Sequence, residues 1–215
     1  VIVEGNIGSG KTTFLKYVQK KFGDKVQIFT EPLHKWRDVK GQNLFELLYK
    51  DPYKWSLPFQ MYADLSRLEI HESTECEGKI KLMERSLFSA KYCFVENVYN
   101  RKFLNDTEYV ILNEFFKYFV KRGHVSADYI IYLRTTPEKC FERIQLRNRK
   151  EEKYITMDYL TSLHDLHEEW LLGNNSEIVN GFKKSKVVTL NANTPLNQLE
   201  RVYEQCSFIF GGETV

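Results

Sequence analysis

The segment that most constrains the fold lies near the N-terminus, where residues 5–12 read GNIGSGKT. An apolar run (VIVE, 1–4) precedes it and a helical pattern (11–22) follows it. A loop of the form G-x-x-x-x-G-K-[ST] between a strand and a helix directs backbone N–H groups at phosphate oxygens. A chance glycine-rich turn is disfavoured, because the motif is complete and correctly placed. The sequence therefore predicts a phosphate-binding loop (P-loop) formed by Gly5, Asn6, Ile7, Gly8, Ser9, Gly10, Lys11, Thr12 and Thr13.

Two side chains of this loop and one later strand end have the chemistry of a nucleotide site. Lys11 should reach the β- and γ-phosphates of a nucleoside triphosphate, and the Thr12 hydroxyl should meet Mg²⁺. The nearest counterpart of a Walker B run is KIKLMER (79–85). There Glu84 could organise Mg²⁺ through water and Arg85 could hold a phosphate or a carboxylate. The alternative is a surface salt bridge between the two, which would contribute little. The guanine-reading motif N/T-K-x-D of GTPases does not occur in the sequence.

The rest of the chain alternates short apolar runs with longer helical patterns, which is typical of a parallel α/β sheet. The apolar runs predict strands at 1–4, 26–30, 79–83, 129–133 and 186–190. Helices are expected at 11–22, 43–50, 54–75, 86–98, 107–122 (ended by Gly123), from Pro137 onward, and at 156–171 and 195–208, with Pro52 separating two of them. The predicted fold class is α/β: one domain, 1–215, with a central five-stranded parallel sheet flanked by helices.

Composition limits the partners and the compartment. The formal net charge is +2, from 31 basic and 29 acidic residues, so nothing favours bulk binding to nucleic acid or to a membrane surface. No apolar run approaches the roughly 18 residues of a membrane span. Because the chain opens at Val1 inside an expected strand, the sequence does not separate a mitochondrial from a cytosolic or nuclear location. An intracellular compartment with reduced thiols is expected from four widely spaced cysteines, Cys76, Cys93, Cys140 and Cys206.

Several longer segments carry a resemblance over nearly the whole chain. In order and spacing they resemble the deoxynucleoside kinases, most closely the mitochondrial thymidine kinase and insect multisubstrate types. The resemblance implies a P-loop kinase fold with an arginine-rich lid at about 143–153. It also implies transfer of the γ-phosphate of ATP, with Mg²⁺, to the 5′-hydroxyl of a deoxynucleoside in nucleotide salvage. The segments are EGNIGSGKTT (4–13), TEPLHKW (30–36), LLYKDPYKW (47–55), LPFQMY (57–62), MERSLFSAKYCFVEN (83–97), IIYLRTTPEKCFERIQLRNRKEE (130–152) and LHDLHEEWL (163–171).

The same resemblance implies roles for the catalytic residues. Glu31, which follows the second strand, is expected to be the general base that takes the proton of the 5′-hydroxyl. Arg85 is expected near the transferring phosphate, where fixed positive charge stabilises the transition state. Glu152 and Tyr49 are expected to hydrogen-bond the sugar 3′-hydroxyl. The lid would supply arginines that close over the phosphates and exclude water, namely Arg143, Arg147 and Arg149.

The base pocket is expected on one face of the helix at 54–75, where Phe59, Gln60, Ala63 and Arg67 share a side. An amide such as Gln60 can pair with a nucleobase edge. The resemblance implies that Gln60 pairs with the base in this way. It also implies that Phe59 and Phe94 stack on the two faces of the base and that Trp36 forms one wall of the cleft. From the residues alone, these aromatics would be core.

Residues 67 and 90 form a mixed pattern. Deoxycytidine and deoxyguanosine kinases pair an Arg at the first position with an Asp at the second, whereas thymidine-preferring types have Met or a similar residue and Ala. This chain has Arg67 with Ala90. Arg67 could fold back onto Asp64 or towards the solvent beside Glu69, or contact the base unaided. The small Ala90 leaves room for a thymine methyl group, so we expect pyrimidine deoxynucleosides as substrates, with broad tolerance.

Two rival functions stay open at this point. A nucleoside monophosphate kinase would need an additional site for the acceptor phosphate. A catalytically silent structural paralogue could lose its catalytic residues without penalty, whereas Lys11, Glu31, Arg85 and the lid arginines are all present here. The resemblance further implies a homodimer packed through the helices at 86–98 and 107–122. It also implies feedback inhibition by a deoxynucleoside triphosphate.

Overall fold

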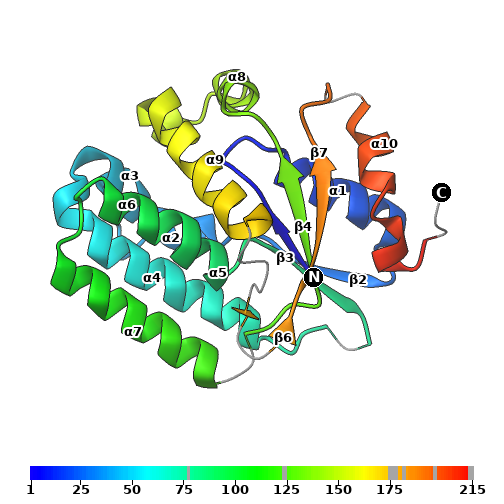
Figure 1. Ribbon diagram of the computed structural model, residues 1–215, viewed down its shortest axis with the longest axis horizontal. Helices are drawn as coiled ribbons and strands as arrows, with labels where there is room; N and C mark the ends of the chain where they lie inside the picture. The colour runs from blue at the N-terminus through cyan, green and yellow to red at the C-terminus, as the bar shows by residue number, and fades with distance from the viewer. Residues whose placement is uncertain (77, 123–124, 174–178, 181–182, 196–197, 213–215) are drawn as a thin grey trace.

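The computed structural model describes residues 1–76, 78–122, 125–173, 179–180, 183–195 and 198–212. At its centre lies a parallel sheet of five strands in the order β2-β3-β1-β4-β7 (Figure 1). β1 occupies the middle, with Ile2 paired to Met83 on one side and to Ile130 on the other. The strands are β1 (Ile2–Glu4), β2 (Val26–Phe29), β3 (Ile80–Glu84), β4 (Tyr129–Arg134) and β7 (Lys186–Asn191). The predicted fold class and five-stranded parallel sheet are confirmed.

Helices cover both faces of the sheet. One face carries α1 (Lys11–Phe22) and α10 (Leu199–Glu204), which lie together beside β7 in Figure 1. The other face carries α5 (Leu87–Ser89), the π-helix η1 (Ala90–Val95), α6 (Glu96–Asn100), α7 (Asp106–Arg122) and α9 (Met157–Leu172). The remaining elements are α2 (Leu33–Arg37), α3 (Leu44–Lys50), α4 (Pro52–Glu72), α8 (Pro137–Arg147), the 3₁₀ turns η2 (Lys150–Tyr154) and η4 (Ser207–Phe210), and a two-stranded antiparallel sheet of β5 (Val179–Asn180) and β6 (Lys183–Lys184).

The two core layers follow from alternation along the central strands. In β1, Ile2 packs into the layer beneath α5, η1 and α9, whereas Val3 packs into the layer beneath α1 and α10. Ile130 and Ile131 of β4 divide between the layers in the same way. Successive side chains of a strand point to opposite faces, so strands buried on both sides read as continuous apolar runs. This arrangement brings the carboxyl ends of β1, β2 and β3 to one edge, where ligands of open parallel sheets bind.

Three local expectations needed correction, one helix was not anticipated, and one expectation is untested. Pro52 separates α3 from α4 as expected, but α4 begins at Pro52 itself rather than at 54, since a proline in the first turn gives up no hydrogen bond. The helix expected at 86–98 is divided by the π-helix η1, and α2 was not anticipated. The helix expected at 195–208 is shorter, because α10 spans Leu199–Glu204 and a 3₁₀ turn follows. Gly123, the expected helix stop, lies outside the described residues.

The longest of the helices formed by the described residues is α4, with 21 residues. None of those helices combines the length and the apolar character that crossing a membrane requires.

Candidate active site

The P-loop is shaped by glycines with left-handed backbone. Gly8 and Gly10 have backbone φ angles of 83° and 102°, values that residues with a Cβ rarely adopt. A Cβ on Gly8 would also lie 2.6 Å from the Cys140 carbonyl oxygen. The turn is closed by the Ser9 N–H, which donates to the Asn6 carbonyl at 3.2 Å, and α1 begins directly after Gly10. The result is a concave run of backbone amides at a helix N-terminus, which suits an anion.

Lys11 is the cation of this loop. The residue is 6% exposed, and its ammonium donates to the carbonyl oxygens of Gly5 and Asn6, at 3.1 and 2.8 Å. Burial lowers the pKa of Lys11 to about 8, and the nearby Arg85 guanidinium acts in the same direction. Glu84 is among the carboxylates that oppose this shift. Carbonyl oxygens carry no net charge, so they only partly stabilise a buried ammonium. A bound phosphate would stabilise the Lys11 ammonium further, because it brings a full negative charge beside it.

Thr12 and Glu84 supply neighbouring oxygens at the mouth of the P-loop. The exposed Thr12 hydroxyl donates to the Glu84 carboxylate at 3.4 Å. Burial raises the pKa of Glu84, and the Lys11 ammonium opposes this rise. Hydroxyl and carboxylate oxygens are ligands that Mg²⁺ accepts, often with several waters retained. The donor set therefore fits the magnesium site predicted from the sequence.

Glu31 lies just beyond the end of β2, between two arginines. Its Oε1 accepts from Arg67 Nη2 at 2.6 Å, and Arg85 Nε lies 3.5 Å from the same oxygen. Burial by itself would raise the pKa of this carboxyl. The charges of Arg85, Arg67 and Lys11 outweigh burial and hold the pKa of Glu31 below its ordinary value. Glu31 is thus an ionised carboxylate inside the cavity.

Arg85 adopts an unusual conformation at the end of β3. Its φ is +63°, a left-handed value in a residue that carries a full side chain. The backbone N–H donates to the Val3 carbonyl at 3.0 Å, and the guanidinium lies over the Phe94 ring, 4.7 Å from its centroid. The surrounding sheet and the ring therefore fix the conformation and aim a buried positive charge at Glu31. Such strain is frequent at functional sites.

The lid arginines pair with Glu152 in this arrangement. Arg147 binds the Glu152 carboxylate through Nε at 3.1 Å and Nη2 at 2.5 Å, and Arg149 Nη1 lies 3.5 Å from it. Arg143 lies deeper, where its guanidinium donates to the carbonyl oxygens of Ser9, Ala192 and Thr194. Arg143 thus braces the P-loop, while Arg147 and Arg149 lie at the border between the P-loop and the acceptor pocket.

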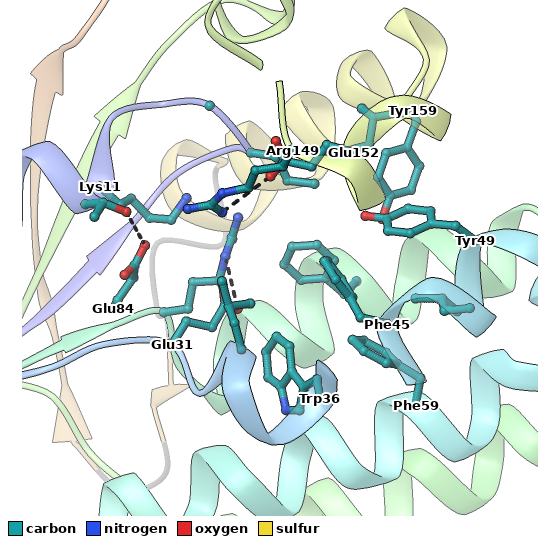
Figure 2. A pocket seen from close by; sticks show the side chains of 18 of the residues that line it. Lys11, Glu31, Trp36, Phe45, Tyr49, Phe59, Glu84, Arg149, Glu152 and Tyr159 are labelled. Carbon is teal, nitrogen blue, oxygen red and sulfur yellow. Dashed lines mark hydrogen bonds and ion pairs between the residues drawn. The ribbon is translucent and has the colours of Figure 1, made fainter. Parts of the chain in front are cut away.

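The acceptor pocket is walled by aromatic rings (Figure 2). Trp36 meets Phe59 edge-on at 5.4 Å, and Phe45 stacks on Phe59 at 5.6 Å. Among the described residues Gln60 is 2% exposed, and its Oε1 is buried without a hydrogen-bond partner. Burial, together with Tyr159 and Glu152, raises the pKa of Tyr49 well above its usual range. A neutral hydroxyl and an unsatisfied amide oxygen are groups that a polar ligand would satisfy.

One cavity connects these groups, and a second opens over the P-loop. The first cavity is lined by Ile7, Gly8, Lys11, Thr12, Glu31, Trp36, Tyr49, Phe59, Gln60, Arg67, Glu84, Arg85, Phe94, Arg147, Arg149 and Glu152 among others. The second, of about 430 Å³, is lined by Gly8, Gly10, Lys11, Thr12, Thr13, Glu84, Arg143, Arg147 and Arg149 among others. Ala63 and Ala90, which were expected in the base pocket, are fully buried core residues and do not line either cavity. The structure therefore brings together most of the residues that were predicted separately.

Comparison with known proteins decides the family. The family model described as "Deoxynucleoside kinase" matches residues 1–207. The chain belongs to this family. Its relatives include "Thymidine kinase 2, mitochondrial" of Macaca fascicularis, 39% identical over 95% of this chain and 75% of that protein. The Homo sapiens protein of the same name is 44% identical over 80% of this chain and 64% of its own length. "Deoxyguanosine kinase, mitochondrial" of Xenopus laevis is 37% identical over 88% and 79%.

This deoxynucleoside kinase has pocket residues that sequence reasoning missed. Phe45, Leu48 and Tyr159 line the acceptor cavity. Phe45 and Leu48 precede Tyr49 by four residues and one residue in α3, so Phe45 shares a helical face with Tyr49. That spacing was the available signal for Phe45, although it equally describes an ordinary core face. Tyr159 follows the lid and carried no comparable signal.

Proposed function

We propose that this kinase transfers the γ-phosphoryl group of ATP to the 5′-hydroxyl of a deoxynucleoside with Glu31 as general base. The observation that carries the proposal is the shared cavity of Lys11, Glu31 and Arg85, which joins the P-loop to the aromatic pocket. A deoxynucleoside in the aromatic pocket would direct its 5′ end towards the P-loop. The family and its kinase relatives support the reaction class.

The proton and the phosphoryl group move in opposite directions in this step. As the 5′-oxygen bonds to the γ-phosphorus, the bond to the β-phosphate oxygen breaks, and ADP leaves with that electron pair. The hydroxyl proton passes to the Glu31 carboxylate. Phosphoryl transfer has a loose transition state, so a carboxylate of low basicity is adequate as an orienting base. Lys11 and Arg85 place fixed positive charge where negative charge shifts during transfer.

We further propose a magnesium ion held by Thr12 directly and by Glu84 through water. Their oxygens, 3.4 Å apart beside the P-loop, support this assignment. Bound there with ATP, the ion would neutralise phosphate charge.

On the acceptor side, Gln60 would pair with the base edge, with Phe59 and Phe94 on the two ring faces and Trp36 at the wall. Tyr49 and Glu152 would hold the 3′-hydroxyl. Because Glu152 is paired with lid arginines, we expect substrate binding to release those arginines towards the phosphates. Arg147 and Arg149 line both cavities, which supports that exchange.

We propose a preference for pyrimidine deoxynucleosides. The relatives at 39% and 44% identity are thymidine kinases by name. Position 90, which was expected to bear on the choice of base, carries only the fully buried methyl group of Ala90. The mitochondrial names of these relatives belong to those proteins and leave this chain's compartment open.

Two partners are proposed as well. Exposed apolar side chains gather on the neighbouring helices α4 and α7, namely Met61, Leu65, Val110, Ile111, Phe115 and Tyr118. The segment 86–98, also expected at a dimer interface, is largely buried within the monomer. We propose a homodimer through α4 and α7, which sedimentation would measure. A deoxynucleoside triphosphate could span both cavities as a feedback inhibitor, because they share Gly8, Lys11 and Thr12.

The rivals fit the geometry less well. A monophosphate kinase would need free positive charge in the acceptor pocket, yet Arg67 and Arg85 are both directed at Glu31. A silent paralogue would not need an ionised carboxylate held in a cavity with the P-loop lysine.

The test is steady-state phosphorylation of thymidine, deoxycytidine, deoxyadenosine and deoxyguanosine with Mg-ATP, comparing wild type with Glu31→Gln. We expect pyrimidines to react best and Glu31→Gln to lower kcat by about 10²–10⁴-fold. Glu69→Gln is the matched control, because Glu69 lies on the exposed side of α4 in an ion pair with Lys35. Unchanged activity of Glu31→Gln would remove Glu31 as the base. Turnover of no deoxynucleoside by wild type would favour the silent paralogue, and faster turnover of thymidine monophosphate would favour the monophosphate kinase.

A further inference from the structure

Arg67 has a partner that its sequence position did not suggest. It projects from α4, is 5% exposed, and donates from Nη2 to Glu31 Oε1 at 2.6 Å. Its guanidinium also lies over the Trp36 ring, 4.9 Å from the centroid. Position 90, where an acid would have competed for Arg67, carries a buried methyl group. Arg67 is therefore held between an aromatic wall and the carboxylate that we propose as the base.

Both arginine contacts end on one oxygen of Glu31. Arg67 Nη2 and Arg85 Nε approach Oε1, at 2.6 and 3.5 Å. Two arginines that bind one oxygen of a carboxylate restrict rotation of the carboxylate group. The second oxygen of Glu31, Oε2, can then accept a hydrogen bond from a hydroxyl group. The Glu31 side chain is 15% exposed and both guanidiniums are nearly buried, so solvent screens this arrangement only weakly.

We propose that Arg67 is a positioning residue, which orients Glu31 so that Oε2 meets the 5′-hydroxyl of the acceptor. This inference rests on the proposed function, in which Glu31 accepts the hydroxyl proton. Arg67 lies on the same side of α4 as Gln60, and its Nε is buried without a partner among the described residues. One side chain thereby connects the region that reads the base with the group that accepts the proton.

The charges around Glu31 make this role measurable. Lys11, Arg67 and Arg85 face the carboxylate and lower its pKa, against burial. Glu84, whose carboxylate is hydrogen-bonded to the Glu31 backbone, is the neighbouring acid. Removing the Arg67 charge leaves burial less opposed, so the pKa of Glu31 must rise. A nearby opposite charge is worth about one to three pKa units. A residue that only packed against Trp36 would leave this pKa in place.

The experiment compares Arg67→Met and Arg67→Lys with wild type over pH 3–9, a range that extends below the ordinary pKa of a glutamate and so includes the wild-type acidic limb. For Arg67→Met we expect kcat to fall about 10–100-fold at pH 7, and the acidic limb of kcat/KM to move up by about one unit or more. Arg67→Lys should keep the limb near its wild-type position while only partly restoring kcat, because an ammonium lacks the planar fork. Lys35→Met removes one positive charge from a surface ion pair with α4 and should move neither quantity.

A double-mutant cycle separates positioning from base reading. If Arg67 acts through Glu31, Arg67→Met added to Glu31→Gln should lower kcat no further. The inference is overturned if Arg67→Met leaves the acidic limb in place, or if it lowers kcat equally in both backgrounds. A rise in acceptor KM alone would likewise overturn it, in favour of a base-reading role.

A second readout does not depend on catalysis. Carbon-13 NMR titration of the glutamate carboxyls, with Glu31 assigned by its loss in Glu31→Gln, should show the Glu31 signal titrating at higher pH in Arg67→Met. This shift would support the positioning contact even if wild type phosphorylated no deoxynucleoside and the proposed function failed. An unchanged titration would overturn the inference while leaving the kinase assignment intact.

Discussion

The donor half and the acceptor half of this site are built in different ways. The donor half is one contiguous segment, residues 5–13, whose backbone amides and glycines form the phosphate cradle. The acceptor half is assembled from side chains of α2, α3, α4 and η1, which the sheet and its connections bring together. Backbone cradles depend on local conformation, whereas side-chain pockets depend on long-range packing. We therefore expect a single substitution in the donor half to cause a large loss of activity. In the acceptor half, where many side chains share the contacts, a single substitution should cause a smaller loss.

Among the substitutions that test this difference between the two halves, Lys11→Met should have the largest effect on activity. Lys11 is the buried ammonium of the donor half, and its loss removes fixed charge from the transferring phosphate. We expect kcat/KM for ATP to fall about 10³-fold, with deoxynucleoside binding little changed. Steady-state kinetics and acceptor titration by calorimetry measure the two quantities. Lys20→Met, an exposed site on α1, is the control. Equal losses on both substrates would show that the halves are not separable.

The next effect concerns the stability of α4, the helix that carries Gln60 and Arg67 of the acceptor half and also the buried Asp64. Burial raises the pKa of this carboxyl from 3.8 to about 7, although Arg67 and Lys91 oppose the rise. The folded-state pKa thus exceeds the unfolded one, so the carboxyl's contribution is fully present below about pH 4. It is lost as the pH rises through about 7. Above pH 7 the wild type must bury a charge that Asp64→Asn lacks.

We therefore expect the free energy of unfolding of Asp64→Asn to exceed that of wild type by about 4 kcal/mol at pH 8 and to differ little from it at pH 4. Urea denaturation at the two pH values measures this. The exposed Asp165→Asn, on α9, should show no such pH dependence. A variant less stable than wild type at pH 8 would mean that the Asp64 charge is compensated within the fold.

The same division explains what the sequence could predict. The P-loop, the five strands and the position of Glu31 follow from local motifs and apolar runs, because their conformation is decided within a few residues. The pairing of Arg67 with Glu31 joins residues 36 positions apart, and Arg67 had been expected near Asp64, near Glu69 or at the base. No local pattern specifies such a partner, since it depends on how α4 packs against the end of β2.

Backbone irregularities were equally hidden. The apolar pattern of 86–98 indicated one helix, but η1 inserts a π-helical turn that begins at Ala90. The left-handed backbone conformation at position 85 could not be predicted, because a positive φ is usually expected at glycine and this residue is an arginine. Both lie beside the reacting groups, where local rules are most often broken in favour of function.

The smallest effect tests how far function is distributed in the acceptor half. Phe45 stacks on Phe59 and lies within 6.1 Å of Trp36, so it is one of several rings that share the pocket. Phe45→Ala should raise the acceptor KM about tenfold and leave kcat within about twofold, since the loss of one aromatic contact is worth about 1 kcal/mol beyond its buried area. Phe208→Ala, in η4 beside Tyr129, removes a ring away from the cavity and should alter neither constant. A fall in kcat at unchanged KM would mean instead that the Phe45 ring helps to place Glu31. The acceptor half would then concentrate its function as the donor half does.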